Sequence, residues 1–196
     1  SEPMNAVDTA WLRMDRPTNL MVVTAMIVVD RCDFQEFITL VRQRFLAFER
    51  FLQRPVCRSG LYFWEPDEDF QLDNHVRRAA LPGMAGKAEL QRFIAELVAT
   101  PLDHARPLWQ FHFIENYGDR CAIVMRVHHC YADGLSLVSV FAALTGENPE
   151  PLPPGQLPGL EPEQPAANDN SAPKVDSWQA YQVIKEAALK SLERYG

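Results

Sequence analysis

The first fifty residues change from a continuous apolar run to apolar positions at helical spacing. Residues 20–29, LMVVTAMIVV, are β-branched and almost wholly apolar, so we expect a central strand covered on both faces. Asp33 and Glu36 then have the spacing of a capping box, which predicts an amphipathic helix beginning at Asp33. The apolar positions of that helix are Phe34, Phe37, Ile38, Val41, Phe45 and Phe48.

Alternating and helical patterns continue through the middle of the chain. Residues 61–64, LYFW, predict a short strand, and apolar residues between 90 and 98 predict a second amphipathic helix that Pro101 closes. Residues 109–113 alternate aromatic and polar side chains, which predicts a strand with one buried face. The turn sequence ENYGD separates this strand from apolar residues 121–127, so the two should form a hairpin. A further helix is expected from about Leu135 to Leu144.

The composition changes abruptly after Gly146. Eight of the fifteen prolines lie in residues 147–176, together with six acidic residues and one basic residue, which is typical of a linker. Residues 177–196 return to helical spacing, with Trp178, Tyr181, Ile184 and Leu192 on one face. We therefore expect a domain at 1–146, a Pro-rich acidic linker at 147–176 and a helix at 177–196 whose apolar face needs a partner.

Charge and cysteine content narrow the class of protein. The linker carries most of the net charge of −7, so the remainder is nearly balanced, which argues against a nucleic-acid partner. The four cysteines form no C-x-x-C pair, and no signal peptide opens the sequence. We therefore expect reduced thiols and a cytoplasmic protein. The longest apolar run is about half of the roughly 20 residues that a membrane span requires, so we expect only peripheral membrane contact.

The stretch VMRVHHCYADGLSLV, residues 124–138, joins an apolar strand to a turn and a second apolar segment. Side chains alternate along a strand, so His128 and His129 would point in opposite directions if the strand persisted. A neutral imidazole at the position of His129 can serve as a general base. Asp133 could cap the next helix or hold the turn through an ion pair, and Gly134 permits a close backbone approach.

These residues leave three interpretations open: a catalytic base, the end of a buried strand, or a metal site. A metal site would use His128, Cys130 and Asp133, but this spacing fits no usual site, so no metal is expected. Cys130 is the only rival nucleophile, and in an extended strand its thiol would face away from His129. Arg126 lies on the strand face opposite His129, and we expect it to pair with a buried acid.

Longer segments of the sequence add a family resemblance. The HHxxxDG motif resembles that of CoA-dependent acyltransferases with the chloramphenicol-acetyltransferase-like fold, and of the condensation domains of peptide synthetases. Residues 4–30 resemble the opening of bacterial wax ester synthase/diacylglycerol acyltransferases. PDEDFQLDNHVRRAALP, residues 66–82, and PLDHARPLWQFHFIEN, residues 101–116, resemble later segments of the same family. These matches occur in the family's order and cover about residues 4–145.

The resemblance implies an α/β fold, with a mixed β-sheet and flanking helices, as the N-terminal half of a two-domain acyltransferase. It implies that His129 is the general base and that His128, Asp133 and Gly134 support the motif. The donor would be a long-chain acyl-CoA, used as substrate with no other cofactor, and the acceptor a fatty alcohol or a diacylglycerol. The partners would include a C-terminal half of the same protein and a peripheral contact with the inner membrane or lipid inclusions.

One departure from the family pattern and two alternatives remain. Cys130 and Tyr131 stand where small or apolar residues are more usual, so Tyr131 could narrow a substrate channel or present a hydroxyl to it. The first alternative is a condensation-type or polyketide-associated acyltransferase that takes its acyl group from a carrier protein. The second is a binding module of the same fold without catalysis, against which the intact His129 and Gly134 argue.

Overall fold

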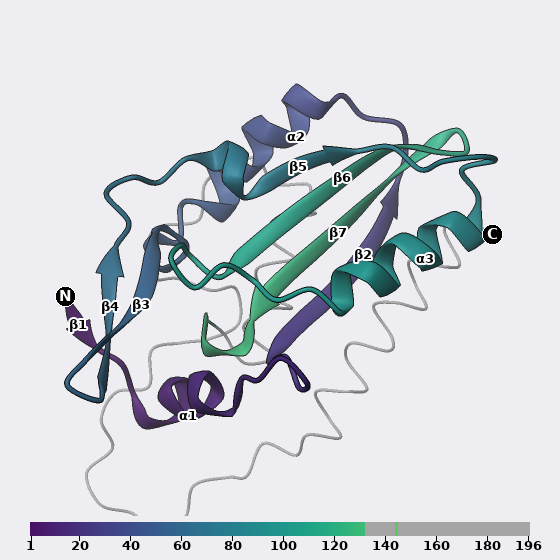
Figure 1. Ribbon diagram of the computed structural model, residues 1–196. Helices are drawn as coiled ribbons and strands as arrows, with labels where there is room; N and C mark the ends of the chain where they lie inside the picture. Colours follow the sequence, from purple (N-terminus) through teal and green to yellow (C-terminus); the bar gives the residue numbers. More distant parts are fainter. Residues whose placement is uncertain (132–143, 145–196) are drawn as a thin grey trace, which may run out of the picture. The chain divides into compact units, whose positions relative to one another are not determined.

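The computed structural model describes residues 1–131 and residue 144. Its main element is a four-stranded mixed sheet in the order β2 (Val22–Val29), β7 (Arg120–His128), β6 (Trp109–Tyr117) and β5 (Val76–Ala79). β5 runs parallel to β6, whereas the other neighbours are antiparallel. Figure 1 shows this sheet with helices packed around it, which confirms the predicted α/β class.

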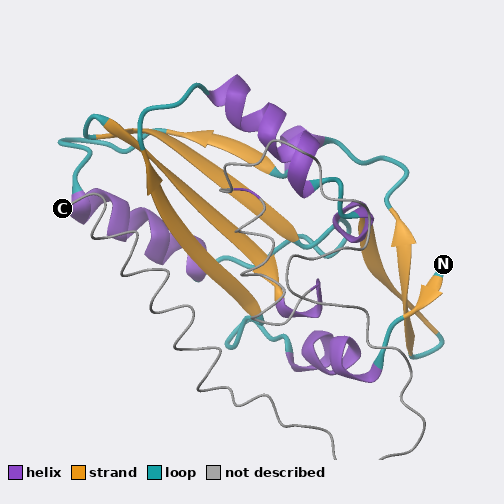
Figure 2. Cartoon of the chain, turned by 180° about the vertical axis from the view of Figure 1, so that it is seen from behind, coloured by secondary structure: helices purple, strands orange, loops and turns teal. Residues whose placement is uncertain are grey.

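Helices cover both faces of the sheet (Figures 1 and 2). α2 (Phe34–Leu40) continues into a π-helical turn, Val41–Phe45, and packs on the face that carries Phe111 and Phe113. α3 (Lys87–Val98) packs on the opposite face, which carries Ile114 and Val124. α1 (Ala6–Met14) lies by the ends of β2 and β7 where the two histidines are found.

A smaller sheet has the strand order β1 (Glu2–Pro3), β4 (Leu61–Pro66), β3 (Gln53–Arg58). β4 contains the predicted strand at 61–64, which is therefore confirmed. Three short 3₁₀ helices complete the described elements, and they span Glu49–Leu52, Leu72–Asn74 and His129–Tyr131.

Several elements follow from local sequence. The Asp33 side chain accepts the N–H of Gln35 at 2.7 Å, and Glu36 accepts the N–H of Asp33 at 3.2 Å, so the capping box is confirmed. The hairpin between β6 and β7 is also confirmed, with Gly118 at φ +60° in its turn. A positive φ is costly for residues with a Cβ atom, which explains glycine there.

Two strand environments differ from the prediction. Residues 20–29 were expected to form a central strand, but β2 is an edge strand that pairs only with β7 among residues 1–131. One face of β2 packs on the core, while Met26 and Val28 on the other face are 42% and 37% exposed. β6 was expected to bury one face, but α3 covers the second, so Ile114 is fully buried and His112 is only 9% exposed. The helix predicted from Leu135, the linker and the helix at 177–196 lie outside the described residues, apart from Leu144.

Candidate active site

β7 ends at His128, and a 3₁₀ turn, His129–Tyr131, begins at once. The N–H of His129 donates to the carbonyl of Met21 at 2.8 Å, which ties the turn to the residue preceding β2. The strand therefore does not persist through His129, and strand alternation does not decide where that ring lies. The two rings nevertheless have different neighbours.

His128 is a buried, neutral imidazole. Its side chain is inaccessible to solvent, and burial is the main reason why its pKa is lowered to about 4, an effect that the nearby Asp15 charge partly opposes. Its Nδ1 accepts the N–H of Cys130 at 3.1 Å. Because Nδ1 is the acceptor, the single ring proton of the neutral form is on Nε2. The surroundings thus select both the charge and the tautomer of His128.

Asp15 was not predicted as a site residue, yet it lies between three parts of the site. Its Oδ1 accepts the N–H of Met21 at 2.7 Å, and its Oδ2 lies 3.1 Å from Nε2 of His104. The same Oδ2 lies 3.9 Å from Nε2 of His128. The carboxylate is only 10% exposed, although the His104 ring is half exposed. A nearly enclosed negative charge therefore stands beside the first histidine of the motif.

His129 has an aromatic rather than a charged neighbour. Its ring stacks on the indole of Trp11, with centroids 4.4 Å apart and planes inclined by 18°. The residue is partly exposed, but Nδ1 is enclosed and has no hydrogen-bond partner within the described part of the chain. Nε2 is therefore the nitrogen that can face a substrate.

Cys130 and Tyr131 both point into the protein interior. Burial raises the pKa of the Cys130 thiol far above its ordinary value, so it is not a thiolate nucleophile. The Tyr131 hydroxyl accepts the N–H of Leu108 at 3.0 Å and donates to the carbonyl of Gln53 at 2.6 Å. Its ring packs between Phe51 and Trp64. The hydroxyl is thus held by two backbone groups in the core.

Arg126 corrects a further expectation. It was expected to pair with a buried acid, but its guanidinium donates instead to the carbonyl of Thr100, just beyond α3, and to the side-chain oxygen of Gln110 at 3.3 Å. Oxygen dipoles there take the place of a carboxylate.

Asp133 and Gly134 lie outside the described residues. No group of three His, Cys, Asp or Glu side chains in the described ranges could hold a metal ion.

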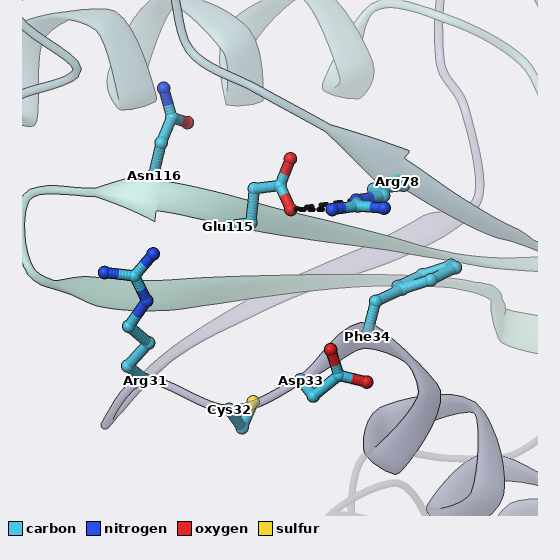
Figure 3. Close-up of a pocket in the computed structure, with 7 residues that line it drawn as sticks. All are labelled: Arg31, Cys32, Asp33, Phe34, Arg78, Glu115 and Asn116. Atoms are coloured by element: carbon cyan, nitrogen blue, oxygen red, sulfur yellow. Dashed lines mark hydrogen bonds and ion pairs between the residues drawn. The ribbon is translucent and has the colours of Figure 1, made fainter.

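A second feature of the structure is a surface pocket with mostly polar and charged lining residues (Figure 3). It is lined by Arg31, Cys32, Asp33, Phe34, Arg78, Glu115 and Asn116, and an ion pair joins Arg78 to Glu115. The register pairs Val22 with His128 but Val29 with Cys121, so the pocket and the histidines lie at opposite ends of the sheet. This pocket is therefore separate from the candidate active site.

Sequence comparison decides the family. Residues 4–192 match the family model of the wax ester synthase/diacylglycerol acyltransferase catalytic domain. The chain belongs to this family. Among the relatives of this chain is a putative diacylglycerol O-acyltransferase of Mycobacterium tuberculosis, 34% identical over 89% of this chain and 36% of its own length. A second, probable diacylglycerol O-acyltransferase of that organism is 34% identical over 74% of this chain and 33% of its own length.

Solved structures agree with this family. The wax ester synthase/diacylglycerol acyltransferase from Marinobacter aquaeolei superimposes with a TM-score of 0.60 and 27% identity, over 69% of this chain and 36% of that one. The starter condensation domain of rhizomide synthetase superimposes with a TM-score of 0.61 over 73% of this chain and 36% of that one. At 14% identity, this second match shows a shared fold alone. The chain spans about a third of the length of the curated relatives that it matches.

None of the helices in residues 1–131 is long and apolar enough to cross a bilayer.

Proposed function

We propose that this chain carries the base of an O-acyltransferase that moves a long-chain acyl group from acyl-CoA to a fatty alcohol or a diacylglycerol. The observation that supports it most is the placement of His129, in the turn directly after a buried strand, in a family of acyltransferases. The ring is held by stacking on Trp11, and its second nitrogen, Nε2, is left for a substrate.

The proposed reaction is a single displacement at the thioester carbonyl. Nε2 of His129 takes the proton of the acceptor hydroxyl as that oxygen attacks the carbonyl carbon, and the new C–O bond gives a tetrahedral intermediate. The C–S bond then breaks, and the protonated imidazole returns its proton to the departing CoA thiolate. The products are an ester and CoA, with no covalent acyl-enzyme. The high pKa of the buried Cys130 thiol agrees with that absence.

His128 and the rest of the motif support the base in this proposal. His128 stays neutral between pH 5 and 8 because burial holds its pKa at about 4, so it adds no positive charge beside His129. Asp133 and Gly134 would shape the segment after the turn, as the family motif implies. In the complete protein, residues that correspond to the unmatched part of the relatives would form the other side of the site and bring the acyl-CoA to it.

The test is ester synthesis by the complete purified protein. Palmitoyl-CoA is supplied with hexadecanol or with dioleoylglycerol, and wax ester, triacylglycerol and free CoA are measured. The proposal predicts ester and CoA in equal amounts from free palmitoyl-CoA. Acylation only from a palmitoylated carrier protein would favour the condensation-type alternative, and acyl-CoA binding without turnover would favour an inactive module.

Apolar substrates of this kind partition into lipid, which supports a peripheral contact between the protein and a membrane or lipid inclusion as part of the proposal. Flotation of the protein with phospholipid vesicles containing dioleoylglycerol measures that contact separately from turnover.

A further inference from the structure

The C-terminal end of α1 contacts both histidines of the motif. Trp11 stacks on His129, and Asp15, one helical turn later, faces His128. The N–H of Asp15 donates to the carbonyl of Trp11 at 3.2 Å, so the backbone of the two residues is fixed one turn apart at the end of α1. Figure 1 shows α1 near the turn that follows β7.

One oxygen of Asp15 reaches the backbone that precedes β2. Oδ1 accepts the N–H of Met21 at 2.7 Å, and the carbonyl of Met21 accepts the N–H of His129 at 2.8 Å. Asp15 therefore holds the residue on which the backbone of His129 rests. A carboxylate that accepts a backbone N–H forms a charge-assisted bond, which is stronger than a bond between neutral groups.

The other oxygen faces the ring of His128. With Nδ1 accepting the N–H of Cys130, the proton on Nε2 is buried and has no hydrogen-bond partner among the described residues. The negative charge of Asp15, 3.9 Å away, is a favourable interaction for this N–H. Loss of the Asp15 charge would leave a buried donor uncompensated and would favour rotation or a 180° flip of the His128 ring.

We propose that Asp15 is a positioning residue for His129 that acts through Met21 and His128. This inference rests on the proposed function, in which His129 is the base. The backbone bonds on either side of the His129 ring both depend on Asp15: His129 N–H to Met21 on one side, and Cys130 N–H to His128 on the other. A base must stay within about 3 Å of the hydroxyl it deprotonates, and a displacement of about 1 Å can lower the rate by about 10²-fold.

Asp15→Asn separates charge from shape. The asparagine oxygen keeps the bond from Met21, but its NH₂ group places a donor opposite the N–H of His128 in place of an acceptor. In the complete protein we expect kcat to fall about 10- to 100-fold, with KM changed by less than about threefold, because substrate contacts remain while the base is displaced. The matched control is Asp119→Asn, which removes an exposed carboxylate from the β6–β7 turn at the other end of the sheet and should leave kcat unchanged.

The route through His128 has its own test. His128→Asn keeps an acceptor near the position of Nδ1 for the N–H of Cys130 but removes the Nε2 end of the ring. If Asp15 acts through the Nε2 end of that ring, Asp15→Asn should lower kcat much less in the His128→Asn variant than in the wild type. If the double variant instead loses kcat by the product of the two single losses, the route through His128 would be overturned.

NMR of ¹⁵N-labelled histidine reports on the ring nitrogens without any turnover. In the wild-type protein at pH 7, we expect His128 to show a protonated Nε2 and an unprotonated Nδ1. Asp15→Asn should shift the ring ¹⁵N signals of both His128 and His129. The opposite His128 tautomer in the wild type, or a wild-type kcat in Asp15→Asn, would overturn the proposal. Failure of the proposed function is distinguishable, because it would appear as activity that is independent of His129.

Discussion

The imidazole of His129 lies against the indole of Trp11, with ring centroids 4.4 Å apart and planes inclined by 18°. The motif HHxxxDG does not contain this contact, because Trp11 comes from the first helix of the chain. The candidate base is therefore held by a β-strand behind it and by α1 beside it. The second support explains how a partly exposed ring next to a turn can keep one orientation.

Trp11 should be replaceable by a smaller aromatic ring but not by alanine. Stacked aromatic pairs contribute about 0.5–1.5 kcal/mol beyond their buried area, so Trp11→Ala should lower kcat/KM by roughly tenfold if that energy holds the base in place. Trp11→Phe keeps a stacking surface and should retain most of the activity. Steady-state kinetics of both variants check this, and equal losses in the two would argue against stacking as the cause.

His128 should matter for stability more than its partly exposed neighbour does. Its ring is fully buried, and its Nδ1 fixes the N–H of Cys130. His128→Ala removes that bond and leaves a cavity, which should lower the free energy of unfolding by about 2–4 kcal/mol. His129→Ala should change it by about 1 kcal/mol or less, because that ring is partly exposed. Urea unfolding of both variants decides the point, and a His128 variant as stable as the wild type would contradict it.

Acid should destabilise the domain well above the pH at which carboxylates are protonated. Burial is the main cause that lowers the pKa of His112 and of His128 to about 4, against about 6.5 in an unfolded chain. Between these values the unfolded chain binds more protons, so the free energy of unfolding rises with pH. The contribution is complete above about pH 6.5 and is lost as the pH falls toward 4, at about 1 kcal/mol per pH unit for each histidine.

Urea unfolding at several pH values from 4.5 to 7.5 measures this slope. Burial also lowers the pKa of His75, so His112→Gln removes one of three such groups and should make the dependence shallower without abolishing it. An unfolding free energy that stays constant over this range would show that the rings bind protons as readily in the folded protein as in the unfolded chain, which contradicts the lowered pKa values.

Local signals in the sequence were sufficient for the elements that depend on neighbours in the chain. The capping box of Asp33 and Glu36 and the turn at Gly118 use contacts within a few residues, and both are found as predicted. Among residues 1–131, β2 lies at the edge of the sheet and not at its centre as predicted, because strand order depends on distant pairing. An apolar run does not distinguish a central strand from an edge strand whose outer face, at Met26 and Val28, remains open.

The surroundings of the histidines were equally non-local. Asp15 is 89 positions from its partner His104, and nothing in the pattern around Asp15 marks a buried acid. Arg126 was expected to find an acid because a buried charge needs compensation, but carbonyl and amide oxygens supply it. The motif thus located the candidate base, while the residues that hold it came from the three-dimensional packing.

Residues 1–196 alone should not catalyse ester formation. The chain spans about a third of the length of its relatives, and β2 presents an unpaired edge and exposed apolar residues in the described part of the fold. Expressed alone, the chain should associate through such surfaces, which light scattering measures. A soluble, monomeric and fully active preparation of residues 1–196 would contradict the proposed need for further residues.

The most direct test of the proposed function compares the complete wild-type protein with its His129→Ala variant in the palmitoyl-CoA assay. The proposal predicts ester formation by the wild type and a turnover about 10²–10⁴-fold lower in the variant, with circular dichroism and melting close to those of the wild type. A well-folded His129→Ala protein that forms ester at the wild-type rate would show that His129 is not the base.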